Sequence, residues 1–112
     1  MNLATILLFV YNRPEHTKKT IEALQKNELA TESMLFIYSD AAKNIDAEVS
    51  VNEVRDYIKT IDGFKKVTVI EREVNWGLAN SIIDGVTKIV NEYGKIIVLE
   101  DDLVTSPYFL KF

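Results

Sequence analysis

The sequence alternates between two kinds of segment, and this alternation limits the folds open to it. Apolar runs with β-branched and aromatic residues lie at residues 3–11, 33–39, 66–71 and 95–99. Between them, apolar residues recur at helical spacing over residues 14–27, 46–61 and 78–93. No hairpin signal joins two strands. The pattern predicts a three-layer α/β/α fold, Rossmann-like, with helices on the faces of a mainly parallel sheet.

Local signals place the ends of the helices. Pro14 suits a first turn, and Asn12 or a neighbour is placed to cap it. The second helix is expected to begin at Asp46 or at Ser50, where Ser50 and Glu53 have capping-box spacing. The third is expected to bury a stripe formed by Leu78, Ile82, Val86, Ile89 and Val90, and to end at Gly94.

The fourth strand carries the most distinctive chemistry. Its run of four apolar residues predicts a strand buried on both faces, and it ends in Glu100, Asp101 and Asp102. One acidic residue there would be a solvated end of a strand. Three in a row repel one another unless a cation, water or hydroxyl groups meet them, so they favour a binding site.

Composition restricts the class of protein. The 112 residues fit one domain, residues 1–112, and the net charge of -4 argues against a nucleic-acid binder. The absence of cysteine excludes disulfides and thiolate metal sites. The apolar run near the N-terminus is too short for a signal peptide or a membrane span, which makes the cytoplasm the expected location.

Polar and charged residues follow each predicted strand. Asn12 and Arg13 follow the first, Asp40 the second, Arg72 the third, and the acidic triplet the fourth. In open α/β sheets, ligands bind beyond the carboxyl ends of the strands. Carboxylates there suit Mg²⁺ or Mn²⁺, which share the phosphates of a substrate, so a site for a polyanion and a metal is expected.

Each of these residues also has a structural interpretation. Asp40 would cap a turn, Arg13 would be an exposed cation, and Arg72 would pair with a neighbouring glutamate. Trp76 is expected to be a hydrophobic plug rather than a platform for a base, and His16 a surface or capping residue. No glycine-rich dinucleotide motif, P-loop or serine or cysteine catalytic set is present.

Taken together, the strand-end residues resemble those of nucleotide-sugar glycosyltransferases of the GT-A fold. The pattern is Tyr11-Asn12-Arg13-Pro14, then Ser39-Asp40, then Arg72-Glu73-x-Asn75-x-Gly77-Leu78-Ala79, then Glu100-Asp101-Asp102. It is similar to the family 2 type and to the N-acetylglucosaminyltransferase I type. The resemblance spans the whole chain and implies that it is the N-terminal, donor-binding part of a longer enzyme.

The resemblance also implies roles for single residues. The acidic triplet would be the DXD motif, with Glu100 where the commonest form has aspartate. Asp102, with Glu100, would bind Mn²⁺ or Mg²⁺ as the cofactor, and Asp40 would lie near the uridine. The residues implied to hold the nucleotide-sugar are Val10, Tyr11, Asn12, Arg13, Asp40, Arg72, Asn75, Gly77, Glu100 and Asp101.

The implied reaction moves a sugar from a nucleotide diphosphate sugar, expected to be a UDP-sugar, to a hydroxyl of a carbohydrate or glycolipid acceptor. Such a bacterial enzyme would serve polysaccharide biosynthesis, and its full-length form would be open to peripheral membrane association. The catalytic base of this family follows the DXD strand, beyond Phe112, so the chain alone is expected to bind the donor without turning it over.

Three other classes compete with this interpretation. A receiver domain is disfavoured because its acid pair follows the first strand, and a sugar nucleotidyltransferase because its glycine-rich basic loop is missing. A non-catalytic module that binds a nucleotide or a partner protein stays open as the alternative.

Overall fold

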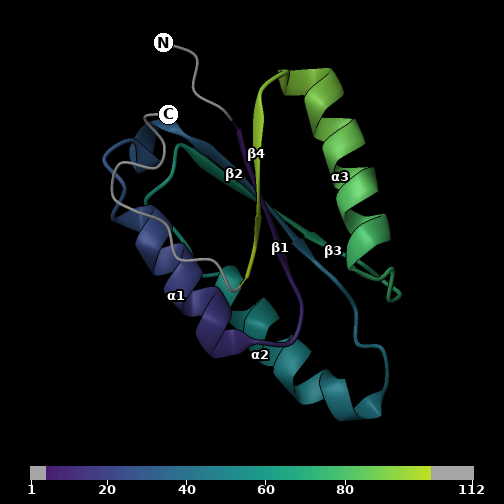
Figure 1. Ribbon diagram of the computed structural model, residues 1–112. Coiled ribbons are helices and arrows are strands. Elements are labelled where there is room, and N and C mark those ends of the chain that lie inside the picture. The colour runs from purple at the N-terminus through teal and green to yellow at the C-terminus, as the bar shows by residue number, and fades with distance from the viewer. Residues whose placement is uncertain (1–4, 102–112) are drawn as a thin grey trace.

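The computed structural model describes residues 5–101, which form a parallel sheet between two layers of helices (Figure 1). The strands are β1 (Thr5–Val10), β2 (Met34–Ser39), β3 (Lys66–Glu71) and β4 (Ile96–Glu100). The helices are α1 (Pro14–Gln25), α2 (Glu48–Ile58) and α3 (Leu78–Tyr93), with short 3-10 turns η1 (Ala30–Glu32) and η2 (Ile45–Ala47). This confirms the predicted α/β architecture.

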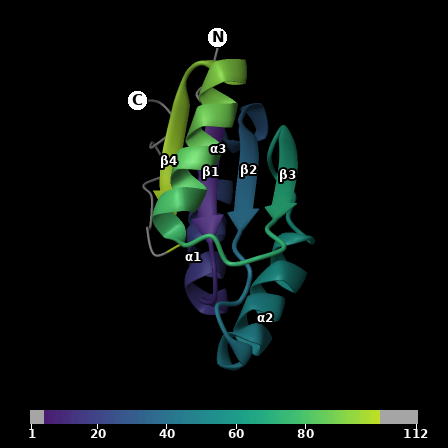
Figure 2. The ribbon, with the colours of Figure 1, turned by 90° about the vertical axis from the view of Figure 1, so that its right-hand side faces the viewer.

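The sheet has the order β3-β2-β1-β4, and all of its pairs are parallel. Figure 2 shows the four strands running in the same direction, with α3 in front of them. β1 is central: Leu8 lies opposite Ile37 of β2 on one side and Leu99 of β4 on the other. The strand ends are therefore close to level, which brings the residues that follow them to one edge.

Alternation along β1 divides the core into two parts. Ile6, Leu8 and Val10 pack with apolar residues of α1 and α2, whereas Leu7 and Phe9 pack with α3. All six residues of β1 are buried, as expected for a parallel strand covered on both faces. Among the described helices, none has an apolar stretch long enough to cross a lipid bilayer.

The expected burial of β4 on both faces is wrong. β4 lies at the edge of the sheet, beside β1, and no strand among residues 5–101 covers its other side. Leu99 is buried against the core, but Val98 is 39% exposed. The apolar run in the sequence reports a strand correctly, but it does not report the position of that strand in the sheet.

Two helix predictions also need correction. α2 begins at Glu48, after η2, because the side chain of Asn44 accepts a hydrogen bond from the amide of Ala47 and caps that turn instead. On α3, the buried residues are Ser81, Gly85 and Ile89, while Leu78 is half exposed. Ile82, Val86 and Ile89 of the predicted stripe pack against the core, whereas Val90 is exposed, and the small residues Ser81 and Gly85 belong to the buried face as well.

Candidate functional site

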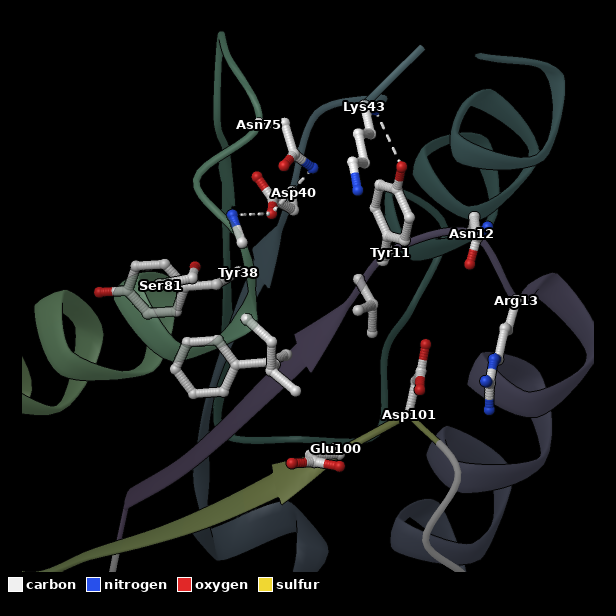
Figure 3. Close-up of a pocket in the computed structure, with 14 residues that line it drawn as sticks. Tyr11, Asn12, Arg13, Tyr38, Asp40, Lys43, Asn75, Ser81, Glu100 and Asp101 are labelled. Carbon is white, nitrogen blue, oxygen red and sulfur yellow. Dashed lines mark hydrogen bonds between the residues drawn. The ribbon is translucent and has the colours of Figure 1, made fainter. Parts of the chain in front are cut away.

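A cavity of about 400 Å³ lies at the edge of the sheet where the strands end (Figure 3). The ends of β1 and β4, the connection after β2, and the loop before α3 surround it. Its lining residues are Phe9, Val10, Tyr11, Asn12, Arg13, Tyr38, Asp40, Lys43, Asn75, Gly77, Leu78, Ser81, Glu100 and Asp101. This is the edge at which ligands bind in open parallel sheets.

Most of the residues expected to hold a nucleotide-sugar lie around this cavity. The strand register explains why: Val10 pairs with Ser39, and Phe9 with Glu100, so the residues after these strands gather at one edge. Arg72 does not line the cavity, and Asp102 lies outside the described residues.

Tyr11 and Lys43 form one side of the cavity. The hydroxyl of Tyr11 accepts a hydrogen bond of 2.9 Å from the backbone amide of Lys43, which ties the end of β1 to the connection after β2. Figure 3 shows the Lys43 side chain on the Tyr11 side of the cavity. Lys43 was not predicted from the sequence, although its place three residues after Asp40 marks it as a cation of a strand-end loop.

Glu100 and Asp101 lie on the side of the cavity formed by β4. The hydroxyl of Thr20 on α1 donates a 2.8 Å hydrogen bond to the carbonyl of Asp101, which fixes the end of β4 against α1. Within residues 5–101, no three acidic, histidine or cysteine side chains gather into a metal site. Two carboxylates suffice for Mg²⁺ or Mn²⁺ when phosphate oxygens complete the coordination, so this donor set fits such a cation.

Asp40 joins the second and third strand-end segments. One carboxylate oxygen, Oδ1, accepts hydrogen bonds from the amides of Ala41 and Trp76, both at 2.9 Å. The other, Oδ2, accepts from the amide of Gly77 at 3.0 Å and from the side chain of Asn75 at 3.3 Å. This carboxylate therefore holds the loop that enters α3.

Arg72 lies behind the cavity wall and is only 7% exposed. Its guanidinium forms an ion pair of 2.8 Å with Asp84 of α3 and contacts the Ser81 hydroxyl. It also lies over the rings of Trp76, at 4.0 Å from the centroid, and of Tyr38, at 4.8 Å. The expectation that Arg72 pairs with a neighbouring glutamate is wrong, because Asp84 is its partner.

Trp76 is also placed differently from the expected hydrophobic plug. Its side chain is 38% exposed and covers the Arg72 guanidinium instead of filling an apolar gap. The favourable contact of a cation with an indole face explains why this residue remains at the surface of the loop.

Burial affects the acid–base behaviour of two groups beside the cavity. Burial raises the pKa of Tyr38, against the opposing charge of Arg72, so its phenol stays protonated at neutral pH. The pKa of Asp84 lies below its ordinary value. Burial alone would raise this pKa, but hydrogen bonds and charges from Arg72 and Lys88 lower it by more. Asp84 is therefore ionised when it pairs with Arg72.

Sequence reasoning missed five of the lining residues. These are Phe9 of β1, Tyr38 of β2, and Leu78 and Ser81 of α3, together with Lys43. Phe9 and Tyr38 stack with ring centroids 5.2 Å apart and form the apolar back of the cavity. Strand periodicity places Phe9 and Tyr38 on a face of the sheet, but it does not show that they lie beside the cavity at the strand ends.

Comparison with known proteins gives one informative likeness. No protein-family model and no curated protein matches the sequence. The structure is similar to the crystal structure of S. aureus TarS, with a TM-score of 0.64 and 16% sequence identity. The match covers 96% of this chain and 18% of the TarS chain. This likeness supports the Rossmann-like α/β fold described above.

Proposed function

We propose that the chain binds the nucleoside diphosphate part of a nucleotide-sugar and belongs to a glycosyltransferase. One observation carries the proposal: the cavity has two carboxylates, Glu100 and Asp101, on one side and two cations, Arg13 and Lys43, elsewhere in its lining. Neither cation has an ion pair within residues 5–101, so both are available to an anionic ligand. The likeness to TarS, a glycosyltransferase, supports the same class of reaction.

The lining residues suggest how such a donor would lie. A metal-bound diphosphate would approach Glu100 and Asp101, and Asp102 is proposed as a further ligand of Mn²⁺ or Mg²⁺. The flat ring of Tyr11 and the amide of Asn12 would contact the nucleoside, which is expected to be uridine. Arg13 and Lys43 would neutralise phosphate charge or donate to base oxygens.

The proposed reaction is displacement at the anomeric carbon of the sugar by a hydroxyl of a carbohydrate or glycolipid. The acceptor oxygen forms a new bond to that carbon and loses its proton to a base, while the bond from the carbon to the diphosphate oxygen breaks and the nucleoside diphosphate leaves with the bonding electron pair. A divalent cation, when bound, stabilises the charge that develops on this leaving group. The chain spans 18% of the TarS chain, and we propose that it supplies the donor side of the reaction.

A thermal-shift titration tests this function. UDP with Mn²⁺ is expected to raise the melting temperature more than UDP or Mn²⁺ alone, because a bound ligand stabilises the folded state by mass action. Asp102→Ala is expected to remove the metal-dependent part of the shift, whereas Asp46→Ala, at an exposed aspartate that does not line the cavity, leaves it unchanged. No shift with UDP, GDP or ADP, with or without metal, would contradict the proposal.

An interaction module is the second candidate, because a separate apolar hollow lies on the outer side of α3. Val74 and Ile83 are each 66% exposed there, and Trp76 lies beside them. This second function would be favoured if the wild-type protein binds a protein partner but no nucleotide, and if the Ile83→Ser substitution abolishes binding of that partner.

A further inference from the structure

The carboxylate of Asp40 is already fully used by the protein. It lies at the end of β2, is 7% exposed, and accepts four hydrogen bonds. A carboxylate offers about four lone-pair positions in total. No acceptor position in good geometry is left for a donor group of a nucleotide.

From this saturation we infer that Asp40 is a positioning residue, which fixes residues 75–77 as a wall of the cavity before any ligand binds. The inference rests on the proposed function only in taking a nucleotide as the ligand that contacts this wall. Asp40 acts on the ligand through the loop, and direct contacts come from other residues of the lining.

The loop turns sharply into α3, and its backbone amides need acceptors there. Gly77 has a φ of 79°, in the left-handed region that favours glycine, and its carbonyl accepts the first hydrogen bond of α3 from Ser81. The amides of Trp76 and Gly77 both point at Asp40. Without an acceptor there, two amide groups in a partly buried position would lose their partners.

The remaining contacts of the loop show that Asp40 holds one side and Arg72 the other. The side chain of Asn75 donates to the carbonyl of Ala41 at 2.8 Å, beside its contact with Asp40. On the opposite side, Trp76 lies over the Arg72 guanidinium. Loss of the Asp40 bonds would therefore free residues 75–77 while leaving the ion pair between Arg72 and Asp84 intact.

Asp40→Asn is the direct test, because the substitution keeps the shape of the side chain but replaces one acceptor oxygen by an NH₂ donor. That NH₂ group would face hydrogen-bond donors from the loop or from Ala41. We expect hydrogen exchange at the Trp76 and Gly77 amides of the ligand-free protein to become at least about tenfold faster. The emission of Trp76, the single tryptophan, should change at the same time. Asp46→Asn is the matched control and should change neither signal.

If Asp40→Asn fails to fold, Asn75→Ala provides a second variant for the same hydrogen-exchange measurement. It removes the side-chain bonds of Asn75 but leaves both backbone amides on Asp40, so a smaller acceleration at residues 76 and 77 is expected. Unchanged exchange at these amides in the ligand-free variants, together with weaker UDP binding, would overturn the inference and make Asp40 a direct contact. Wild-type protein that binds no nucleotide would contradict the proposed function alone, since the exchange result is measured without ligand.

Discussion

At the residue scale, two threonines on the buried face of α1 differ in whether their hydroxyl groups form hydrogen bonds. Thr20 donates a hydrogen bond to the carbonyl of Asp101. The hydroxyl of Thr17 is fully buried and has no hydrogen-bond partner among the described residues. A buried hydroxyl without a partner costs free energy relative to an apolar group of the same shape.

Thr17→Val is therefore expected to raise the free energy of unfolding by about 1 kcal/mol, since valine has the same shape and no unpaired hydroxyl. Thr20→Val, the matched control, is expected to lower it by about 1 kcal/mol because the bond to Asp101 is lost. Urea denaturation measures both. Equal destabilisation by the two substitutions would show that Thr17 has a partner after all.

The partner of Arg72 shows what sequence alone leaves open at this scale. Glu71 and Glu73 are its neighbours in the chain, but Glu71 pairs with Arg55 of α2 and with Lys59, which follows that helix. Arg72 is turned to the other face, where Asp84 of α3 meets it. Strand alternation places consecutive side chains on opposite faces, and the docking of α3 then decides the partner. Local spacing contains no information about that docking.

At the element scale, α3 approaches the sheet so closely that a small residue is required. A Cβ atom added to Gly85 would lie 3.0 Å from ring atoms of both Phe9 and Tyr38. Of the apolar stripe predicted from the sequence, Ile82, Val86 and Ile89 pack in the same cluster as these rings, whereas Leu78 and Val90 are exposed. Hydrophobic periodicity identified the helix and part of its buried face correctly, but it missed Ser81 and Gly85 because glycine and serine carry no hydrophobic signal.

Gly85→Ala is expected to lower the free energy of unfolding by about 1–3 kcal/mol, because overpacking against the two rings outweighs a gain of about 1 kcal/mol in helix propensity. Asn91→Ala, at an exposed position of the same helix, gains propensity without a steric cost and is expected to be neutral or stabilising. Urea denaturation of the two variants compares them. A more stable Gly85→Ala protein would contradict the close contact between α3 and the sheet.

At the scale of the whole molecule, strand–helix alternation was enough to predict the layers, the parallel sheet and the edge that carries the cavity. Asn12, Asp40 and Glu100 meet there because parallel strands end together. Which strand lies at the edge, and how α3 sits on the sheet, depend on contacts between distant segments. β4 and Arg72 were misjudged for this reason.

The ion pair between Arg72 and Asp84 links the end of β3 to α3 and should make the stability of the molecule depend on pH. The folded-state pKa of Asp84 is lower than its ordinary value of 3.8, so its contribution is fully present above that value. It is lost as pH falls through the folded-state pKa. Asp84→Asn should therefore be less stable at pH 7, and its stability should change less between pH 5 and pH 2 in urea titrations. The exposed Asp56→Asn is the control, and parallel curves for wild type and Asp84→Asn would contradict the linkage.

The central claim is that the cavity at the strand ends binds a nucleoside diphosphate together with a divalent cation. Amide NMR spectra of the chain, recorded with UDP and then with a trace of paramagnetic Mn²⁺, test it most directly. UDP is expected to shift the amides of Tyr11, Asn12 and Lys43, and Mn²⁺ to broaden those of Glu100 and Asp101 more strongly when UDP is present. Spectra unchanged by UDP, or shifts confined to the hollow beside Ile83, would contradict the claim.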